Sequence, residues 1–285
     1  MDPQTFMEIA TVVSKLKMYP YFDISNYILM CTMVRDDNHP SNSGSSPFSR
    51  KHPLACYISS MLLCFAGSIF ANFLIGEPLI TSFKNNDDIL TASIVWYLIN
   101  YSPFDVVYKL CKFLPCKLLI YCLKEVQRAN KVHHGVLHAM KHYPDAYVII
   151  ALIGVVKGAG YYYMRIIERL VRGYWVPSSH EVLQPSFVTK GSLAAAIVFI
   201  LERKGFIEAP HVLIYFGVVI FFVYFRLSAL LLGIHDPFVP FENLFCAVFM
   251  GGMWDALSRA LGRGKTPEEQ ATVNGAKRPE DKKKD

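Results

Sequence analysis

The chain has 285 residues, of which 53% are hydrophobic and only 18% are charged, below the roughly 25% that soluble domains carry. Its net charge of +6 gathers near the ends of apolar segments and in the C-terminal tail, unlike the interleaved basic and aromatic surface that binds nucleic acid. Residues 54–76 and 212–234 are uncharged except for Arg226, and each run exceeds the roughly 20 residues that cross a bilayer as a helix. The composition therefore predicts a polytopic membrane protein.

Seven candidate spans follow one another in chain order. Glu8, Lys15 and Lys17 interrupt the N-terminal segment, which argues against a cleaved signal peptide and fits an amphipathic lead into the first span. A run at 244–254 is too short to cross and is predicted to lie at the interface. The seven spans are predicted at residues 21–34, 54–76, 89–107, 113–133, 146–165, 187–201 and 212–234.

The distribution of lysine and arginine predicts the orientation of the spans. Short cytosolic loops carry an excess of these residues. The side that includes Arg35, Arg165 and Lys190 holds more of them than the side that includes Lys84 and Lys141. The N-terminus is therefore predicted to be luminal and the C-terminus cytosolic.

Residues 261–285 are predicted to form a disordered basic tail, because they hold no aromatic residue and are rich in Lys, Glu and Pro. Lys282 and Lys283 stand in the fourth and third places from the end. This spacing resembles the dilysine retrieval signal of endoplasmic-reticulum membrane proteins. A charge run that only increases solubility is the alternative.

The seven spans divide as three, three and one. A three-span unit ends on the opposite side of the membrane from its start, so a second copy must be inverted. The middle span of each half carries glycines deep in its apolar run, at Gly67 and at Gly154, Gly158 and Gly160. The predicted fold is an all-α membrane protein with inverted three-helix repeats at 1–112 and 113–205, then a seventh transmembrane helix and a short cytosolic-side helix at 206–260.

Glycine inside a spanning helix has two interpretations. Small residues let neighbouring helices pack closely, and Gly154 and Gly158 have the spacing typical of such contacts. Alternatively, a kink or break turns backbone groups toward an aqueous path. The charge of Lys157 at this depth favours the second interpretation, so Gly67 and Gly154 are predicted to be kink or pore residues.

The fourth span changes from apolar to basic along its length. Lys124, Arg128 and Lys131 fall on one helical face, and Glu125 is available to pair with one of them. Two cations four residues apart suit a phosphate headgroup, or they can move as gating charges in the membrane field. The alternative is that the helix leaves the membrane at Lys124.

Histidine and cysteine offer candidate metal ligands, but no metal site is predicted. His134, His138 and His142 recur at a spacing of four and could bind a metal or sense pH. A polar luminal helix end is the favoured interpretation. The seven cysteines include no C-x-x-C pair and are interpreted as small buried hydrophobic residues.

Several motifs together resemble the trimeric intracellular cation channel family. They occur in order over most of the chain, from about residue 20 to residue 235. They are His52-Pro53, Gly76-Glu77-Pro78, Trp96-Tyr97-Leu98 with Pro103-Phe104-Asp105, Lys124-Glu125-Val126 with Arg128 and Lys131-Val132, and Lys157-Gly158-x-Gly160.

The resemblance implies a seven-span homotrimer with one pore per protomer, no enzymatic activity and no enzymatic cofactor. It also implies potassium as the permeant ion, the endoplasmic or sarcoplasmic reticulum membrane as the location, and counter-ion current during calcium release. In that family, the two basic residues of the fourth span are implicated in voltage response and phosphoinositide binding. Here these residues are Lys124 and Arg128. We hypothesise that they meet Lys157, Gly158 and Gly160 and bind a phosphoinositide (PIP2) headgroup.

Two other classes of function stay open. A membrane-embedded enzyme needs a catalytic motif, and the sequence holds no H-E-x-x-H, no G-x-S-x-G and no paired Asp motif within a span. A secondary transporter can share the inverted-repeat architecture. Steady single-channel current would separate a channel from a transporter, and headgroup turnover by the purified protein would reveal an enzyme.

Overall fold

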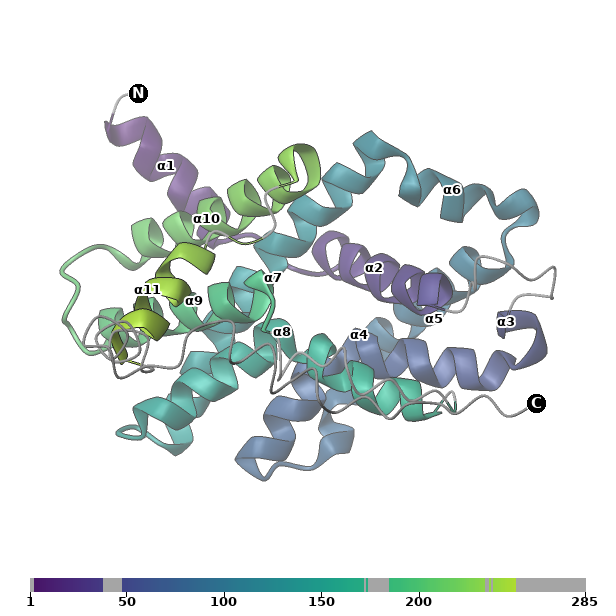
Figure 1. Ribbon diagram of the computed structural model, residues 1–285, viewed down its shortest axis with the longest axis horizontal. Helices are drawn as coiled ribbons and strands as arrows, with labels where there is room; N and C mark the ends of the chain where they lie inside the picture. The colour runs from purple at the N-terminus through teal and green to yellow at the C-terminus, as the bar shows by residue number, and fades with distance from the viewer. Residues whose placement is uncertain are drawn as a thin grey trace, which may run out of the picture. The chain divides into compact units, whose positions relative to one another are not determined.

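The computed structural model describes residues 3–37, 48–171, 173, 185–233, 236 and 238–249. Within these ranges every regular element is a helix (Figure 1). The chain divides into two units, Met1–Asp236 and Pro237–Asp285. The first unit holds α1 (Pro3–Ser14), α2 (Tyr21–Asp37), α3 (Phe48–Lys51), α4 (Pro53–Ile75), η1 (Leu79–Phe83), α5 (Asn86–Tyr101), η2 (Pro103–Asp105), α6 (Val106–Lys112), α7 (Leu114–His142), α8 (Tyr147–Val171), α9 (Phe187–Arg203) and α10 (His211–Leu232), and the second holds α11 (Val239–Phe249).

The ends of the long helices follow local sequence signals. Pro53 and Pro115 lie in the first turns of α4 and α7, where a missing backbone N–H costs no hydrogen bond. Gly76 ends α4 with a φ of +87°, and the backbone N–H groups of Gly76 and Glu77 both donate to the Asn72 carbonyl at 2.9 Å. This turn holds Glu77 immediately beyond the end of α4.

Three of the described helices, α4, α8 and α10, are long and apolar enough to cross a membrane by length and composition. They coincide with the second, fifth and seventh predicted spans. The helices α2, α5 and α9 have 17, 16 and 17 residues. The helix α7 has 29 residues but carries the basic segment that begins at Lys124.

Two helices end far from the ends of the predicted spans. The third predicted span, 89–107, stops earlier, because α5 ends at Tyr101 and Pro103 does not continue it. Phe104 and Asp105 then take positive φ values of 54° and 57° before α6 begins. The fourth predicted span, 113–133, continues unbroken as α7 to His142.

Outside the seven predicted spans, the structure describes only part of the chain. The amphipathic lead is a separate helix, α1, rather than an extension of α2. The short apolar run predicted at 244–254 lies partly in α11, and residues 250–254 fall outside the described residues. The tail predicted at 261–285 also falls outside them.

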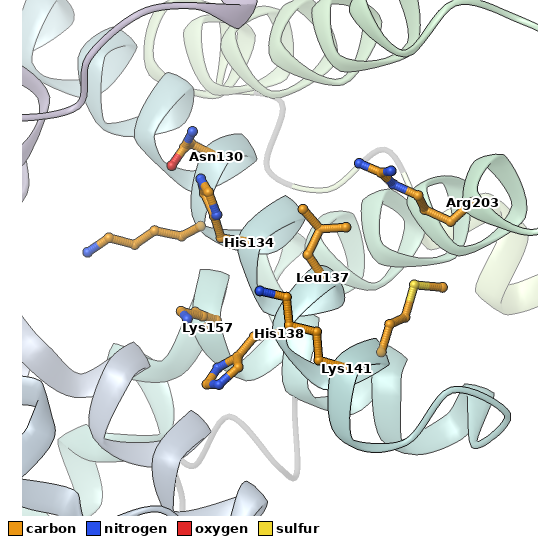
Figure 2. Close-up of a pocket in the computed structure, with 9 residues that line it drawn as sticks. Asn130, His134, Leu137, His138, Lys141, Lys157 and Arg203 are labelled. Atoms are coloured by element: carbon orange, nitrogen blue, oxygen red, sulfur yellow. The ribbon is translucent and has the colours of Figure 1, made fainter.

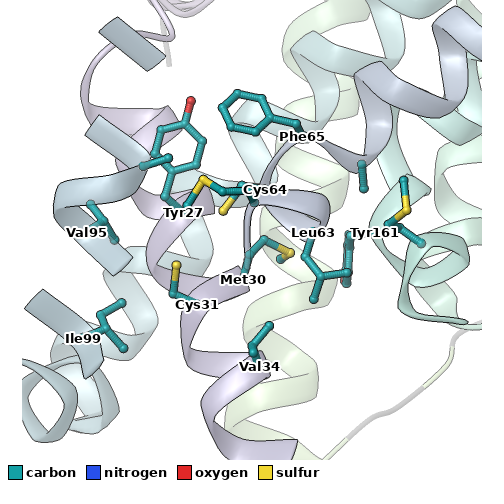
Figure 3. Close-up of a cluster of buried hydrophobic side chains, with 14 of the residues drawn as sticks. Tyr27, Met30, Cys31, Val34, Leu63, Cys64, Phe65, Val95, Ile99 and Tyr161 are labelled. Carbon is teal, nitrogen blue, oxygen red and sulfur yellow. The ribbon is translucent and has the colours of Figure 1, made fainter. Parts of the chain in front are cut away.

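Two hydrophobic cores in the first unit share the helix α8. The first core gathers side chains of α2, α4 and α5 against Ala159, Tyr161 and Met164 of α8 (Figure 3). The second gathers side chains of α7, α9 and α10 against Ile150 and Ile153 of α8. The helix α8 packs extensively on both α4 and α7. It therefore joins the first predicted repeat to the second.

Ion pairs gather the helix ends in two groups. The first group joins the end of α2 to the turn after α5, to α6 and to the end of α8, through Arg35–Asp105 at 2.8 Å, Lys112–Asp36 at 2.8 Å and Arg165–Asp37 at 2.6 Å. In the second group, Glu77–His138 at 2.9 Å joins the end of α4 to the end of α7. Lys204–Asp145 at 3.2 Å joins the end of α9 to the start of α8. Consecutive long helices from α2 to α9 therefore alternate in direction.

The Arg35–Asp105 pair makes stability depend on pH. The hydrogen bond from Arg35 lowers the pKa of Asp105 below its ordinary value. Because the folded pKa lies below the unfolded value, the pair stabilises the fold above an unfolded pKa of about 3.9, and this contribution is lost as pH falls through the folded pKa.

Asp105→Asn is therefore expected to destabilise the protein near neutral pH and to matter less below about pH 4. The side chain of Asp105 is 46% exposed, and solvent screening keeps the expected loss to about 0.5–1 kcal/mol. Thermal unfolding of both proteins at the two pH values measures this. A difference that persists undiminished in acid would contradict the assignment.

Candidate functional site

The basic segment of α7 lies inside the helix bundle. Lys124, Glu125, Gln127 and Arg128 are all buried, and α2, α8 and α10 pack around the helix. The helix runs for five further turns beyond Lys124. Charges at such positions need partners, because desolvation of an unpaired charge is costly.

Lys124 is held by polar side chains of its own helix and of α2. Its side chain is 5% exposed, and Nζ donates to Asn26 Oδ1 and, at 3.0 Å, to Gln127 Oε1. The Gln127 amide donates in turn to Asp23 Oδ1. A chain of hydrogen bonds therefore ties the charge of Lys124 to the start of α2.

Glu125 is a buried acid shared by two arginines. It is 0% exposed and accepts a hydrogen bond on Oε2 from Arg128 Nη1, one turn along α7. Its Oε1 lies 3.7 Å from Nε of Arg226 on α10. Arg128 is 1% exposed, and its guanidinium also lies 5.8 Å from the ring centroid of Phe222. Together with Lys124, this group holds three basic side chains and one acidic one, and of these Arg226 is partly buried at 21% exposure.

The glycines of α4 and α8 lie at close helix contacts. A Cβ on Gly67 would lie 2.4 Å from the backbone oxygen of Lys157, and one on Gly160 would lie 2.8 Å from Cα of Gly67. A Cβ on Gly154 would meet Val136 at 2.9 Å. Both helices continue without interruption through these residues. These glycines therefore lie where helices pack closely, and neither helix is broken at them, while a role for Gly67 and Gly154 at a kink or pore stays a prediction.

Gly158 and Lys157 face different parts of α7. A Cβ on Gly158 would lie 2.4 Å from Cγ2 of Val132 and 3.5 Å from Cγ of Arg128, so this glycine lets α8 approach the buried arginine. Lys157 faces Gly135 instead. Gly135 is 11 residues beyond Lys124, or about 16 Å along the helix. The predicted meeting of Lys157 with the Lys124–Arg128 pair is therefore wrong, whereas that of Gly158 with Arg128 is present.

The side chain of Lys157 lines a cavity of about 820 Å³ beside α7 (Figure 2). The charged side chains among its described lining residues are basic. The lining consists of Asn130, Lys131, His134, Leu137, His138, Met140, Lys141, Lys157 and Arg203. Lys131, predicted on the same face as Lys124 and Arg128, belongs to this cavity rather than to the buried group.

The histidines of α7 have different neighbours. His134 and His138 both line the cavity, and His138 and His142 lie beside Glu77 at the end of α4. Sequence reasoning missed the contact with Glu77, because nothing local links residues 61 positions apart. It also missed the roles of Asn26 and Arg226. A lone charge deep in an apolar span is the signal that could have found Arg226.

Comparison with known proteins shows a consistent relationship. The profile of the TRIC channel family matches residues 42–233. The protein named "Trimeric intracellular cation channel type 1B.1" from Caenorhabditis elegans is 52% identical over 266 residues, which are 93% of this chain and 89% of that protein.

Two solved structures share the fold. A trimeric intracellular cation channel from C. elegans with bound Ca²⁺ has 51% identity and a TM-score of 0.75, over 81% of this chain and 99% of that chain. A structure described as the basis for activity of TRIC counter-ion channels in calcium release has 32% identity and a TM-score of 0.73, over 79% of this chain and 99% of that chain. The all-helical membrane fold and the sequence identity agree, and the chain belongs to the trimeric intracellular cation channel (TRIC) family, which is a family of ion channels and not of enzymes.

Proposed function

We propose that the chain is a potassium channel of the endoplasmic or sarcoplasmic reticulum membrane that supplies counter-ion current during calcium release. It would act as a homotrimer with one pore per protomer, as the names of its relatives suggest. A relative at 32% identity is described as a counter-ion channel in calcium release. Ca²⁺ is a further proposed ligand, since a relative at 51% identity was solved with it.

The observation that carries this proposal is the group formed by the buried Lys124, Glu125 and Arg128 with the partly buried Arg226. Its excess positive charge lies inside the helix bundle, where the membrane potential acts on it. Moving one charge fully across the membrane changes the energy by about 2.3 kcal/mol per 100 mV. A displacement of α7 would therefore couple voltage to the bundle.

Phosphoinositide modulation is proposed at the same group. Arg128 would grip the phosphate through its planar fork and Lys124 would act as a point charge. Both side chains are buried, so a PIP2 headgroup reaches them only when α2 or α10 moves away from α7. Gly158, beside Arg128, belongs to this proposed site, whereas Lys157 lines the cavity and Gly160 lies against Gly67.

The proposed topology has seven transmembrane helices, namely α2, α4, α5, α7, α8, α9 and α10. Two inverted repeats at 1–112 and 113–205 would be followed by α10. The alternation of ion-paired helix ends supports this arrangement, with the group around Asp37 cytosolic and the group around Glu77 luminal. The N-terminus is then luminal and the C-terminus cytosolic. Protection of a C-terminal tag from protease on sealed microsomes would contradict this orientation.

Planar-bilayer recording of purified trimers in asymmetric KCl tests the function. Steady single-channel current carried by potassium is expected, and its absence in active reconstitutions would favour a transporter. The double variant Lys124→Ala with Arg128→Ala is expected to weaken phosphoinositide binding and to change the voltage dependence of open probability. The trimer should still fold, because Glu125 keeps Arg226 as a partner.

Lys131→Ala is the matched control for lipid binding. Lys131 lies on the same helix but lines the cavity, so its loss should leave phosphoinositide binding unchanged. Unchanged lipid binding and gating in a well-folded double variant would mean that Lys124 and Arg128 serve only to stabilise the bundle.

A further inference from the structure

A carboxylate and two imidazoles meet where α4 and α7 end. Nε2 of His138 lies 2.9 Å from Oε1 of Glu77, and Nε2 of His142 lies 3.9 Å from the same oxygen. One donor atom from each of the three residues lies within 4.8 Å of the other two. We propose that Glu77, His138 and His142 form a binding site for a divalent transition-metal ion, with Zn²⁺ as the best match.

The donor set and its spacing carry the proposal. Zinc binds histidine nitrogen and carboxylate oxygen at about 2.0–2.2 Å in tetrahedral geometry, which sets neighbouring ligand atoms about 3.3 Å apart. The two measured separations lie on either side of that value, so small rotations of the side chains suffice to enclose an ion. Two nitrogens and one oxygen also suit zinc better than Ca²⁺, which takes six to eight oxygen ligands.

A second contact prepares His142 for this role. Its Nδ1 lies 3.1 Å from the backbone carbonyl of His138, to which a protonated Nδ1 donates. Such a bond to the outer nitrogen fixes the tautomer that leaves the lone pair of Nε2 free, as is usual for metal-binding histidines. His138 and His142 are four residues apart on α7 and therefore present both rings on the same face.

The backbone also restrains the carboxylate. Glu77 follows Gly76, and the N–H groups of both residues donate to the Asn72 carbonyl. The three side chains are 25–43% exposed, which leaves a path for an ion and a fourth position for water. A metal ion here would link the end of α4 to the last turns of α7, the helix that carries Lys124 and Arg128.

An effect of the ion on conduction would rest on the proposed channel function. The binding of the ion does not rest on it, so the experiment measures binding. Purified full-length protein is titrated with ZnCl₂ in a calorimeter and, separately, with Co²⁺ while visible absorption is recorded. Wild type is expected to bind one Zn²⁺ per chain at this site, and Co²⁺ should give the intense bands of a four-coordinate ion. Ca²⁺ should not compete.

Three variants and one control locate the ion. Glu77→Gln, His138→Ala and His142→Ala are each expected to weaken zinc binding by more than about 100-fold, above the 10–100-fold typical of losing an outer partner. His134→Ala removes a histidine that is also four residues from His138 but is not one of the three grouped donors, and it should bind zinc as wild type does. The proposal is overturned if wild type does not bind zinc, if the three variants bind it unchanged, or if His134→Ala loses binding equally.

Discussion

Glu125→Gln is expected to lower the apparent unfolding temperature of the purified protein by about 10 °C, the largest effect expected here of a single substitution in α7. Removing one member of a buried ion pair typically costs about 3–5 kcal/mol, because the remaining charge stays buried without compensation. Here two arginines, Arg128 and Arg226, would lose the negative charge of their partner, and Lys124 lies nearby. About 2–4 °C per kcal/mol for a chain of this size gives the expected shift.

The double variant Glu125→Gln with Arg128→Met tests the cause of this loss. It removes one anion and one cation together, and replacing both partners of a buried pair is far less costly than removing one. At least half of the lost stability should return. If Glu125→Gln melts within a degree or two of wild type, the carboxylate does not balance the arginines.

Gly67→Ala is expected to destabilise the protein by about 1–3 kcal/mol, the usual range for overpacking a tight contact. The added methyl group would lie 2.4 Å from the backbone oxygen of Lys157. A backbone atom cannot rotate away, so α4 and α8 must separate along their whole contact. Thermal unfolding of the purified protein measures the loss.

Gly217→Ala is the matched control for this prediction. Gly217 also lies within a long apolar helix, α10, but a Cβ there meets nothing within 4 Å. Its replacement should be neutral or stabilising by up to about 1 kcal/mol, because alanine favours helix over glycine. Equal losses of stability for both substitutions would show that the close contact with Lys157 is not the reason why position 67 requires glycine.

Several features of this protein were predictable from the sequence alone. The apolar runs that form α4, α8 and α10 can be recognised from the sequence, because the ability to cross a bilayer depends on the composition of about 20 consecutive residues. The helix ends at Pro53 and Gly76 can also be predicted from the sequence, because the backbone conformation at each end depends on one or two residues. The basic face of α7 follows from helical periodicity, and the ordered motifs identified the family.

The partners of those residues were decided only by the tertiary structure. Lys124 meets Asn26, Glu125 meets Arg226, and Glu77 meets His138, across 98, 101 and 61 positions of the chain. Such contacts depend on how each helix is rotated about its axis and on where two helices cross. The glycines at the crossing of α4 and α8 set that rotation through backbone contact. For this reason Lys157, one residue before Gly158, faces the cavity while Gly158 faces Arg128, a difference that sequence spacing alone does not reveal.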